Sequence, residues 1–451
     1  MLKVVSRPLV RLAERYLPTA YVFAVILTAI VAVVALAITD IGPVEVVRAW
    51  GDGLTGLLAF MTQMALVLLL GYILANTGPV RRLLERLAHV PRTPVQAYGF
   101  VAFCAAVASL FTWGLGLVVA ALLSIEVARV GRDRGIRLHY PLLVASGYSG
   151  FVVWHMGYSG SGPLAAATPD SFVEEQLGYT IPVSETIFSS WNMIAALVTV
   201  IVVVGTMMLM APGAKDRIVE LPEGASLEEG DDGSPIDTGE GGRVPADRID
   251  RSRVVTTGLG VFLLAYLVIY FAQEGLALTL DIVNWTFLCL ILLLVSSARE
   301  LGQLVAKAAS NVGEILVQFP LYAGIMGIMT ASGLVEMLAD FFVSISNDVT
   351  LGLWSFLAGG LVNVFVPSGG GQFAIQAPIF LDAATQLGVD PAIVVMGISY
   401  GDQWTNMIQP FWALPMLAIA RLRIRDVMGF TTVTLIVTGI VFAVTMILAS
   451  L

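Results

Sequence analysis

Charged residues are scarce in this chain. Asp, Glu, Lys and Arg make up 13% of its 451 residues, whereas 57% are hydrophobic, and the mean hydropathy is +0.86. A soluble globule of this size needs far more polar surface than this composition provides. The composition therefore excludes a soluble protein and predicts an all-α polytopic membrane protein.

Cysteine and histidine are also rare. The two cysteines, Cys104 and Cys289, both lie in apolar runs, so the sequence predicts neither a disulfide framework nor a thiolate metal site. No pair of histidines has metal-ligand spacing, and the sequence contains no nucleophile–base pair or Walker sequence. We therefore predict no enzyme activity, no cofactor, no metal and no nucleic-acid partner; Na⁺ or H⁺ is expected as a coupling ion.

Lysine and arginine are unevenly distributed. Of the 24 such residues, 23 fall in segments that one topology places on the cytoplasmic side, and Arg48 is the exception. Cytoplasmic loops are enriched in Lys and Arg, so we predict a multi-pass protein of the cytoplasmic (inner) membrane with its N-terminus inside and its C-terminus outside. The basic segments are residues 1–17, 76–94, 129–137, 211–253, 299–307 and 421–425.

The two halves of the chain share one order of apolar segments in opposite orientation. Each half has two crossings, a short hairpin, an interrupted crossing and a final crossing. We predict inverted repeats over residues 18–210 and 282–450, joined by an acidic cytoplasmic linker, 211–253, and a transmembrane helix, 254–272. Inverted repeats whose broken helices meet near the midplane are typical of secondary transporters.

Each predicted hairpin has glycines at its tip. Residues 366–372 read V-P-S-G-G-G-Q between arms of about fifteen residues, shorter than the roughly twenty that span a bilayer. Residues 112–116, T-W-G-L-G, lie between apolar arms over 95–111 and 117–128 whose outer flanks are both basic. Irregular backbone at membrane depth persists where it is buried or lines a wet cavity, so we predict re-entrant hairpins with tips at a ligand site.

The interrupted crossings add two further unwound stretches, residues 157–163 and 401–410, and we expect all four stretches to converge. They offer backbone N–H groups, hydroxyls, the amides of Gln403 and Gln409, and Trp412 nearby. The predicted substrate-binding residues are Thr112, Trp113, Gly114, Ser159, Gly160, Ser161, Ser368, Gly369, Gly370, Gly371, Gln372, Trp404 and Asn406.

The four stretches contain no lysine or arginine. Short half-helices direct the positive ends of their dipoles at a ligand, so an anion is favoured even without a cationic side chain. A di- or tricarboxylate usually needs a cationic partner. The predicted ligand is therefore a singly charged, partly apolar anion.

Two ionisable residues are candidates for ion coupling. Asp402 is an intramembrane carboxylate, which is costly and so indicates a proton or sodium group; the alternative is a structural hydrogen bond to freed backbone. His155 titrates near neutral pH as a free side chain, but a satisfied structural histidine is equally consistent with the sequence.

The glycines and tryptophans also have structural explanations. The tip at 368–371 is alternatively a tight turn that lets helices pack closely, and residues 157–162 are alternatively a small-residue packing surface of the kind that membrane bundles use. Trp113 and Trp404 fit a ligand wall and plain packing equally well.

Several long stretches resemble the short-chain fatty acid transporters, the bacterial group linked to acetoacetate and butyrate uptake. The resemblance covers nearly the whole chain and is weak in the linker and at both termini. The matching stretches are W-G-D-G at 50–53, T-W-G-L-G-L-V-V at 112–119, Y-S-G-S-G-P-L-A-A-A-T-P at 158–169, V-Q-F-P-L-Y-A-G-I from Val317, V-P-S-G-G-G from Val366, and Q-W-T-N-M-I-Q-P-F-W-A-L-P at 403–415.

This resemblance implies import of short-chain monocarboxylates. Similarity to a wider group of hairpin-bearing ion transporters implies a homodimer with an elevator-like motion. Two positions depart from the family's pattern: Gln372 is often histidine in relatives, and His155 is often a small residue.

Two classes of function remain open at this stage. The first is a secondary carboxylate transporter, a symporter driven by a proton or sodium gradient; the second is a cation antiporter or channel-like conductance without an organic substrate. A receptor that signals through the linker is disfavoured, because the linker contains no recognisable domain. Direct binding of an organic anion separates the first two classes.

Overall fold

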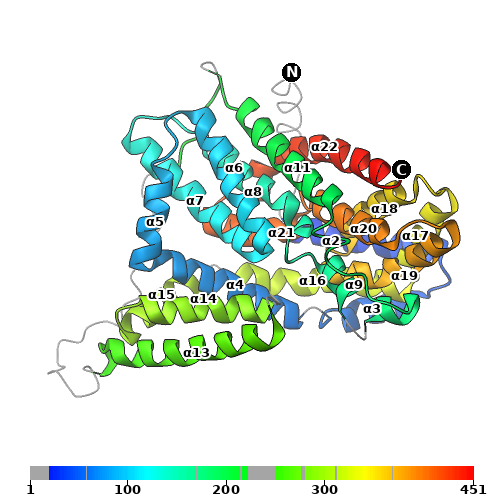
Figure 1. The fold of residues 1–451 in the computed structure, drawn as a ribbon, viewed down its shortest axis with the longest axis horizontal. Helices are drawn as coiled ribbons and strands as arrows, with labels where there is room; N and C mark the ends of the chain where they lie inside the picture. Colours follow the sequence, from blue (N-terminus) through cyan, green and yellow to red (C-terminus); the bar gives the residue numbers. More distant parts are fainter. Residues whose placement is uncertain are drawn as a thin grey trace.

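The computed structural model describes residues 20–56, 58–168, 171–213, 216–221, 249–275, 280–309, 312–367 and 369–451. These residues form helices and no strand (Figure 1), which confirms the all-α prediction. Most of the acidic linker and the basic N-terminal segment lie outside the described residues.

The first half of the chain contains two long helices before the predicted hairpin and an interrupted helix after it. The helices are α2 (Ala20–Ile38), α3 (Pro43–Gly53), α4 (Leu58–Asn76), α5 (Gly78–Ala88), α6 (Pro94–Phe111), α7 (Trp113–Asp133), α8 (Tyr140–Gly150), the 3₁₀ helix η1 (Phe151–Met156), α9 (Ser161–Ala167), α10 (Phe172–Leu177) and α11 (Ser190–Leu209).

The second half also contains long, short and interrupted helices. It contains α13 (Arg253–Glu274), α14 (Leu280–Leu294), α15 (Ala298–Ala309), α16 (Gly313–Ala331), α17 (Leu334–Ser344), α18 (Leu351–Phe365), α19 (Gly369–Leu387), α20 (Pro391–Thr405), α21 (Pro410–Ala420) and α22 (Ile424–Ala449).

The helices pack as two groups. The inner bundle comprises α6 to α9 with η1, α11, and α18 to α22; its helices interlock, with α18 against α20, α6 against α7 and α8, and α11 against α22. The outer bundle comprises α2 to α4 and α13 to α16, and Figure 1 shows α13, α14 and α15 along the lower left edge, away from α20 and α22. Both halves of the chain therefore contribute to each group.

Five helices among the described residues are each long and apolar enough to cross a membrane. They are α6, α7, α11, α13 and α22, and further apolar helices of 10–17 residues accompany them. Large apolar side chains are exposed along such helices, for example Phe262 at 76% and Val254 at 79% on α13. A surface of this kind faces lipid, so the protein is a multi-pass membrane protein.

The second arm of the first predicted hairpin is longer than expected, whereas the first arm has about the expected length. α6 has 18 residues and α7 has 21, because α7 continues past Ala128 through two arginines to Asp133. The prediction of a 12-residue arm over 117–128 was therefore wrong. In the second predicted hairpin, α18 has 15 residues, as expected, whereas α19, which packs against it, has 19 and is longer than the predicted fifteen or so. That either pair enters and leaves on one side of the membrane stays a prediction.

The turn between α6 and α7 consists of a single extended residue. Thr112 has φ −158° and ψ 136°, which ends α6 and begins α7. A Cβ atom on Gly116 would stand 2.0 Å from Ser109 Oγ, so a larger residue at position 116 would force the two helices apart. The glycine therefore lets α6 and α7 lie close together beyond the turn. This close packing brings Trp113 to the interior of the inner bundle.

Both interrupted helices are present, with different limits from those predicted. The first changes to 3₁₀ geometry at Phe151 and is neither α- nor 3₁₀-helical over residues 157–160, where a turn lies between the extended residues Gly157 and Gly160, before α9 begins. The second remains helical through Gly401 and Asp402, and its break covers residues 406–409. Gln409 begins the next half-helix by accepting a 3.0 Å hydrogen bond from Phe411 N–H, while Pro410 supplies the first helical residue.

Candidate functional site

Asp402 is a carboxylate buried inside the inner bundle. It lies in the last turn of α20 with 1% of its surface exposed. Gln372 Nε2 of α19 donates to Asp402 Oδ2 at 2.6 Å, and Asn406 Nδ2 donates to Oδ1 at 3.3 Å. A buried carboxylate is costly unless its oxygens accept hydrogen bonds, and these two amides supply them.

His155 faces the same carboxylate from the first half of the chain. Its Nε2 lies 3.7 Å from Asp402 Oδ1, beyond hydrogen-bond distance, and 1% of the residue is exposed. Neither ring nitrogen has a hydrogen-bond partner. The backbone N–H of His155 donates to Gln403 Oε1 at 2.9 Å and thereby joins η1 to α20. The two predicted coupling residues are therefore neighbours, although 247 positions separate them in the sequence.

Asn363 connects α18 to the end of α20. Its Nδ2 lies 2.9 Å from Asp402 O, 2.9 Å from Thr405 Oγ1 and 2.7 Å from Asn406 Oδ1. An amide NH₂ group carries two hydrogens, so it satisfies at most two of these three acceptors at one time. The contacts fix the arm of the predicted hairpin to the helix that carries Asp402.

Gly369, the first residue of α19, brings the glycine-rich tip against His155. A Cβ atom on Gly369 would stand 2.9 Å from Trp154 Cη2 and 3.1 Å from both His155 Nε2 and Ser161 Oγ. Contacts this short leave little room for a larger residue. The next residue, Gly370, is exposed and a Cβ atom there would have no neighbour within 4 Å. The tip is thus packed on one side and open on the other.

The tip between α6 and α7 reaches the same region through its backbone and through aromatic contacts. Trp113 N–H donates to Ser159 Oγ at 3.0 Å, and the Trp113 ring lies 5.4 Å from the Trp412 ring in an edge-to-face arrangement. The Trp412 ring is 5.6 Å from Trp154 and 5.7 Å from Phe151. We call Trp113, Phe151, Trp154 and Trp412 the aromatic cluster. All four predicted stretches contribute to, or touch, this region.

The predicted site residues fall into two sets. One lies around the buried carboxylate, and the other lies at the α6–α7 turn and in the first break. The first set is Asp402, His155, Gln372, Asn406, Gly369 and Ser161. The second set consists of Thr112, Trp113 and Gly114 at the α6–α7 turn and of Ser159 and Gly160, all of them buried. Gly371 is half-buried beside the tip, and Ser368 lies outside the described residues.

Trp404 lies apart from this set. Its indole N–H donates to Leu435 O of α22 at 2.6 Å, and its ring packs 4.8 Å from the ring of Phe356. A Cβ atom on Gly439 of α22 would stand 2.8 Å from Trp404 Nε1. Of the two explanations open for Trp404, the contacts support packing, since its ring docks α20 against α22.

Close packing also explains two glycines of the first break. A Cβ atom on Gly157 would stand 2.2 Å from Leu110 O, and one on Gly162 would stand 2.4 Å from Ser399 Oγ. Each glycine therefore allows another helix to approach. Residues 157 and 162 act as small packing residues, whereas Ser161 between them is half-buried beside the tip.

Three residues of the site were not predicted from the sequence. Asn363 and Trp154 contact the predicted residues directly, and Gln376 Nε2 lies 3.2 Å from Gln372 Oε1. The available signal was polarity inside an apolar arm: Asn363 and Gln376 are fully buried amides on either side of the tip. Trp154 gave no such signal, because a tryptophan in an apolar run is ordinary.

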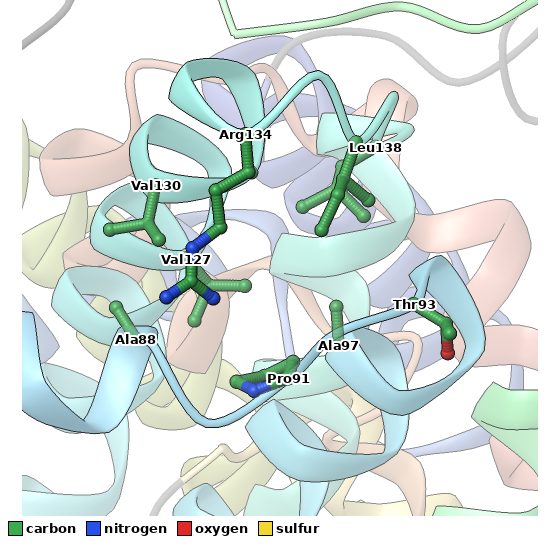
Figure 2. Close-up of a pocket in the computed structure, with 10 residues that line it drawn as sticks. Ala88, Pro91, Thr93, Ala97, Val127, Val130, Arg134 and Leu138 are labelled. Carbon is green, nitrogen blue, oxygen red and sulfur yellow. The ribbon is translucent and has the colours of Figure 1, made fainter.

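Two of the cavities lined by described residues lie elsewhere in the protein. One has a volume of about 10 Å³, and Figure 2 shows Arg134 reaching across it towards Ala88 and Pro91. A volume of this size holds about one water molecule, too little for an organic anion. The other, of about 480 Å³, is an apolar groove between α11 and α22 lined by residues such as Ile194 and Val444. Neither includes a residue of the buried polar site.

Among the described residues, no group of three or more His, Cys, Asp and Glu side chains is placed to hold a metal ion. The polar atoms around Asp402 are amide groups and an imidazole, which suit hydrogen bonding to a carboxylate or an anion.

Apolar spanning helices, two interrupted helices that meet, and a buried carboxylate at their meeting point define an α-helical membrane transporter. The comparisons with known proteins agree with this class. A family model described as "Short chain fatty acid transporter" matches residues 1–449. The chain belongs to the short-chain fatty acid transporter family, which is a family of transporters and not of enzymes, and the resemblance noted in the sequence is confirmed.

Two relatives match along almost their whole length. A protein of Escherichia coli (strain K12) is 40% identical over 442 residues, which cover 98% of each chain. A protein of Haemophilus influenzae is 36% identical over 455 residues, which cover 98% of this chain and 99% of that one. Both are named, provisionally, as short-chain fatty acid transporters.

Two solved structures align with almost the whole chain at low identity. The YdaH transporter of Alcanivorax borkumensis is 15% identical with a TM-score of 0.44, covering 95% of this chain and 98% of that one. MtrF of Neisseria gonorrhoeae, from a class of antimetabolite efflux pumps, is 15% identical with a TM-score of 0.43, covering 96% of each chain.

Proposed function

We propose that this protein imports short-chain fatty acids, small monocarboxylates such as butyrate or acetoacetate, by symport with a proton or a sodium ion. The observation that carries the proposal is the meeting of His155 and Asp402 where both interrupted helices are joined, in a chain that matches the family over residues 1–449. An ionisable pair in that position is what gradient-driven transport requires.

The surroundings of the pair suit a small monocarboxylate. Gln372, Asn406 and Gln403 provide uncharged hydrogen-bonding groups, and the four stretches contain no arginine or lysine that would attract a second negative charge. The aromatic cluster beside Ser161 and Gly369 offers an apolar wall for a short alkyl chain. The coupling residues are Asp402 and His155, and the protein uses no other cofactor.

The same proposal includes a location and an orientation. The protein lies in the inner membrane with its N-terminus inside and its C-terminus outside, and two inverted repeats move as part of an elevator-like homodimer. Contacts in or next to the predicted cytoplasmic segments support placing these segments on one side: Arg134 Nη1 donates to His89 O at 2.9 Å, and Tyr140 OH, just after residues 129–137, donates at 2.9 Å to Ala420 O, just before residues 421–425. These bonds bring three basic segments to one side of the molecule.

Uptake into liposomes that contain the purified protein tests the proposal. Labelled acetoacetate and butyrate are offered with an inward proton gradient, an inward sodium gradient or neither, and protein-free liposomes correct for passive entry of the undissociated acid. Gradient-driven uptake that unlabelled short-chain acids inhibit is expected. Dissipation of a cation gradient without movement of either acid would instead identify a cation antiporter or conductance.

A further inference from the structure

His155 combines deep burial with two ring nitrogens that have no hydrogen-bond partner. A buried polar group without a hydrogen-bond partner destabilises the fold. Native proteins therefore keep such a group chiefly where a bound molecule or a proton provides the missing interaction. The nearest acceptor is Asp402 Oδ1, 3.7 Å from Nε2. The imidazole therefore lies beside a carboxylate but makes no hydrogen bond to it.

Two further buried N–H groups accompany His155 without partners. Trp154 Nε1 belongs to the preceding residue, whose ring lies 3.5 Å from the imidazole ring, and Gln403 Nε2 belongs to the amide whose oxygen accepts the His155 backbone N–H. That backbone bond fixes which end of the Gln403 amide is the donor. Indole and amide N–H groups only donate, so this set suits an anion.

The position is next to the open side of the tip. Ser161 Oγ and His155 Nε2 would both stand 3.1 Å from a Cβ atom on Gly369, and Ser161 is half-buried while Gly370 is exposed. An anion that binds at the tip is therefore close both to the exposed residue Gly370 and to the buried N–H donors that have no partner.

The charge at Asp402 sets a condition on such an anion. A substrate carboxylate next to His155 is also close to the Asp402 carboxylate, and two like charges inside a protein repel strongly. One positive charge between them removes the repulsion. A protonated imidazole supplies that charge and also two N–H donors, one for each carboxylate, from the two nitrogens that now have no partner.

We propose that His155 takes up one proton together with each substrate anion, and that the resulting imidazolium bridges the substrate carboxylate and Asp402. The proton comes from the outer solution with the anion and leaves with it on the inner side. Transport is therefore electroneutral, with one proton per monocarboxylate. This inference rests on the proposed function and names its coupling ion and its binding groups.

Sodium fits the same place less well. Both oxygens of Asp402 accept N–H bonds from the amides of Gln372 and Asn406, so a cation would have to displace those hydrogens. Hard cations also prefer several oxygen ligands to an imidazole.

Among the described residues, Asp402 is the charged side chain within ion-pair distance of His155. Two buried phenol groups on helices packed against η1 have other partners, since Tyr148 OH donates to Asn406 O and Tyr400 OH donates to Asn192 Oδ1. The remaining titratable residues in the break, on α19 and on the helices packed against η1 and α19 are Tyr98, Cys104, Glu126, Arg129, Arg132, Asp133, Tyr140, Tyr158, Glu174, Glu175, Glu336, Asp340 and Asp382.

Calorimetric titration of the purified protein with acetoacetate and with butyrate tests the proposal. Titration in two buffers with different ionisation enthalpies, without sodium, gives the number of protons bound per anion. About one proton is expected for the native protein and for the control His89→Gln, whose side chain is exposed. His155→Gln should bind at least tenfold more weakly and without proton uptake.

Asp402→Asn provides an independent variant, because it removes the charge that makes the proton necessary. It should still bind the anion, with a proton count near zero. Binding by the native protein that takes up no proton, or that requires sodium, would overturn this inference and leave the proposed function intact. If neither acid binds the native protein or its His89→Gln control, either without sodium or after sodium is added, the proposed function itself fails.

Discussion

Gln372 donates a 2.6 Å hydrogen bond from Nε2 to Oδ2 of Asp402, and this bond ties the first turn of α19 to the last turn of α20. The glycine-rich tip begins three residues before Gln372, at Gly369. Any change in the charge of Asp402 therefore acts directly on the helix that carries the tip.

Asp402→Asn should abolish accumulation while it preserves exchange. An asparagine keeps the shape of the side chain but removes the charge that links substrate movement to an ion gradient. In proteoliposomes, the ratio of internal to external acid should then stay at about 1 under a proton gradient, since no coupling free energy remains. Asp382→Asn, on the exposed face of α19, is the matched control and should accumulate normally. Full accumulation by Asp402→Asn would remove this residue from the coupling site.

Gly369→Ala should impair transport more than a glycine substitution elsewhere in the inner bundle. The added Cβ would press on Trp154, His155 and Ser161. Overpacking of a close-packed site costs about 1–3 kcal/mol, and an equal loss of transition-state stabilisation lowers kcat/KM by about 5- to 160-fold. Gly205→Ala on α11, where no atom lies within 4 Å of the new Cβ, should change kcat/KM less than about twofold. Equal effects of the two substitutions would contradict the packing of the tip.

Trp404→Phe should lower stability and leave substrate affinity unchanged. The variant keeps an aromatic ring against Phe356 and loses the N–H that donates to Leu435 O. Loss of one such bond costs about 1 kcal/mol. Thermal unfolding in detergent should show a lower Tm, with the KM of uptake within error of the native value. A raised KM at unchanged Tm would return Trp404 to the substrate site.

Acid should loosen the contact between His139 and the start of the linker. Val219 N–H donates to His139 Nδ1 at 3.0 Å, and Arg137 pairs with Glu220 at 2.9 Å. Burial lowers the pKa of His139 from 6.5 to about 4, and the Asp216 carboxylate offsets part of that shift. The unfolded chain thus binds the proton more readily than the folded chain. The stabilisation is complete above about pH 6.5 and is lost as the pH falls towards 4.

The measurement for this prediction is Tm as a function of pH in detergent. The native protein should lose stability between about pH 6.5 and 4. His139→Asn, which has an acceptor oxygen but does not titrate, should show a shallower loss over the same range. Identical pH profiles for the two proteins would show that this contact does not control the response.

Single cysteines at exposed positions test the predicted orientation. In a background without Cys104 and Cys289, an impermeant maleimide added to intact cells should label cysteines at Tyr179 and Asp348, which we predict to be outside. A cysteine at Asp133 should react only after permeabilisation. Labelling of Asp133 and Tyr179 from the same side would refute the topology.

The class of the protein and the existence of both breaks could be read from the sequence, because scarce charge and glycine-rich interruptions in apolar runs have direct structural meaning. The residues at which each break begins and ends could not be read from the sequence. Asp402 and Gly401 looked unwound because glycine is a poor helix former, yet α18 packs so closely on α20 that a Cβ on Gly401 would stand 2.3 Å from Gly360 N. Tertiary packing there overrides local propensity.

The candidate site was partly predictable for a related reason. Polar residues such as Asp402 and His155 stand out in an apolar chain, and the structure places them 3.7 Å apart. Trp404 and Trp154 could not be distinguished by sequence, since each is an indole within two residues of a candidate coupling residue. Only the direction of each ring separates them: Trp154 touches the tip at Gly369, and Trp404 points to α22.

The amide of Asn363 has two hydrogens and three oxygens within reach, so it cannot donate to all three at one time. The same groups can therefore pair in more than one way without repacking any side chain. The arm that carries the tip is thus held by a hydrogen-bonded contact with alternative pairings. A contact of this kind can keep two helices together while they turn slightly against each other, which a single fixed hydrogen bond would resist.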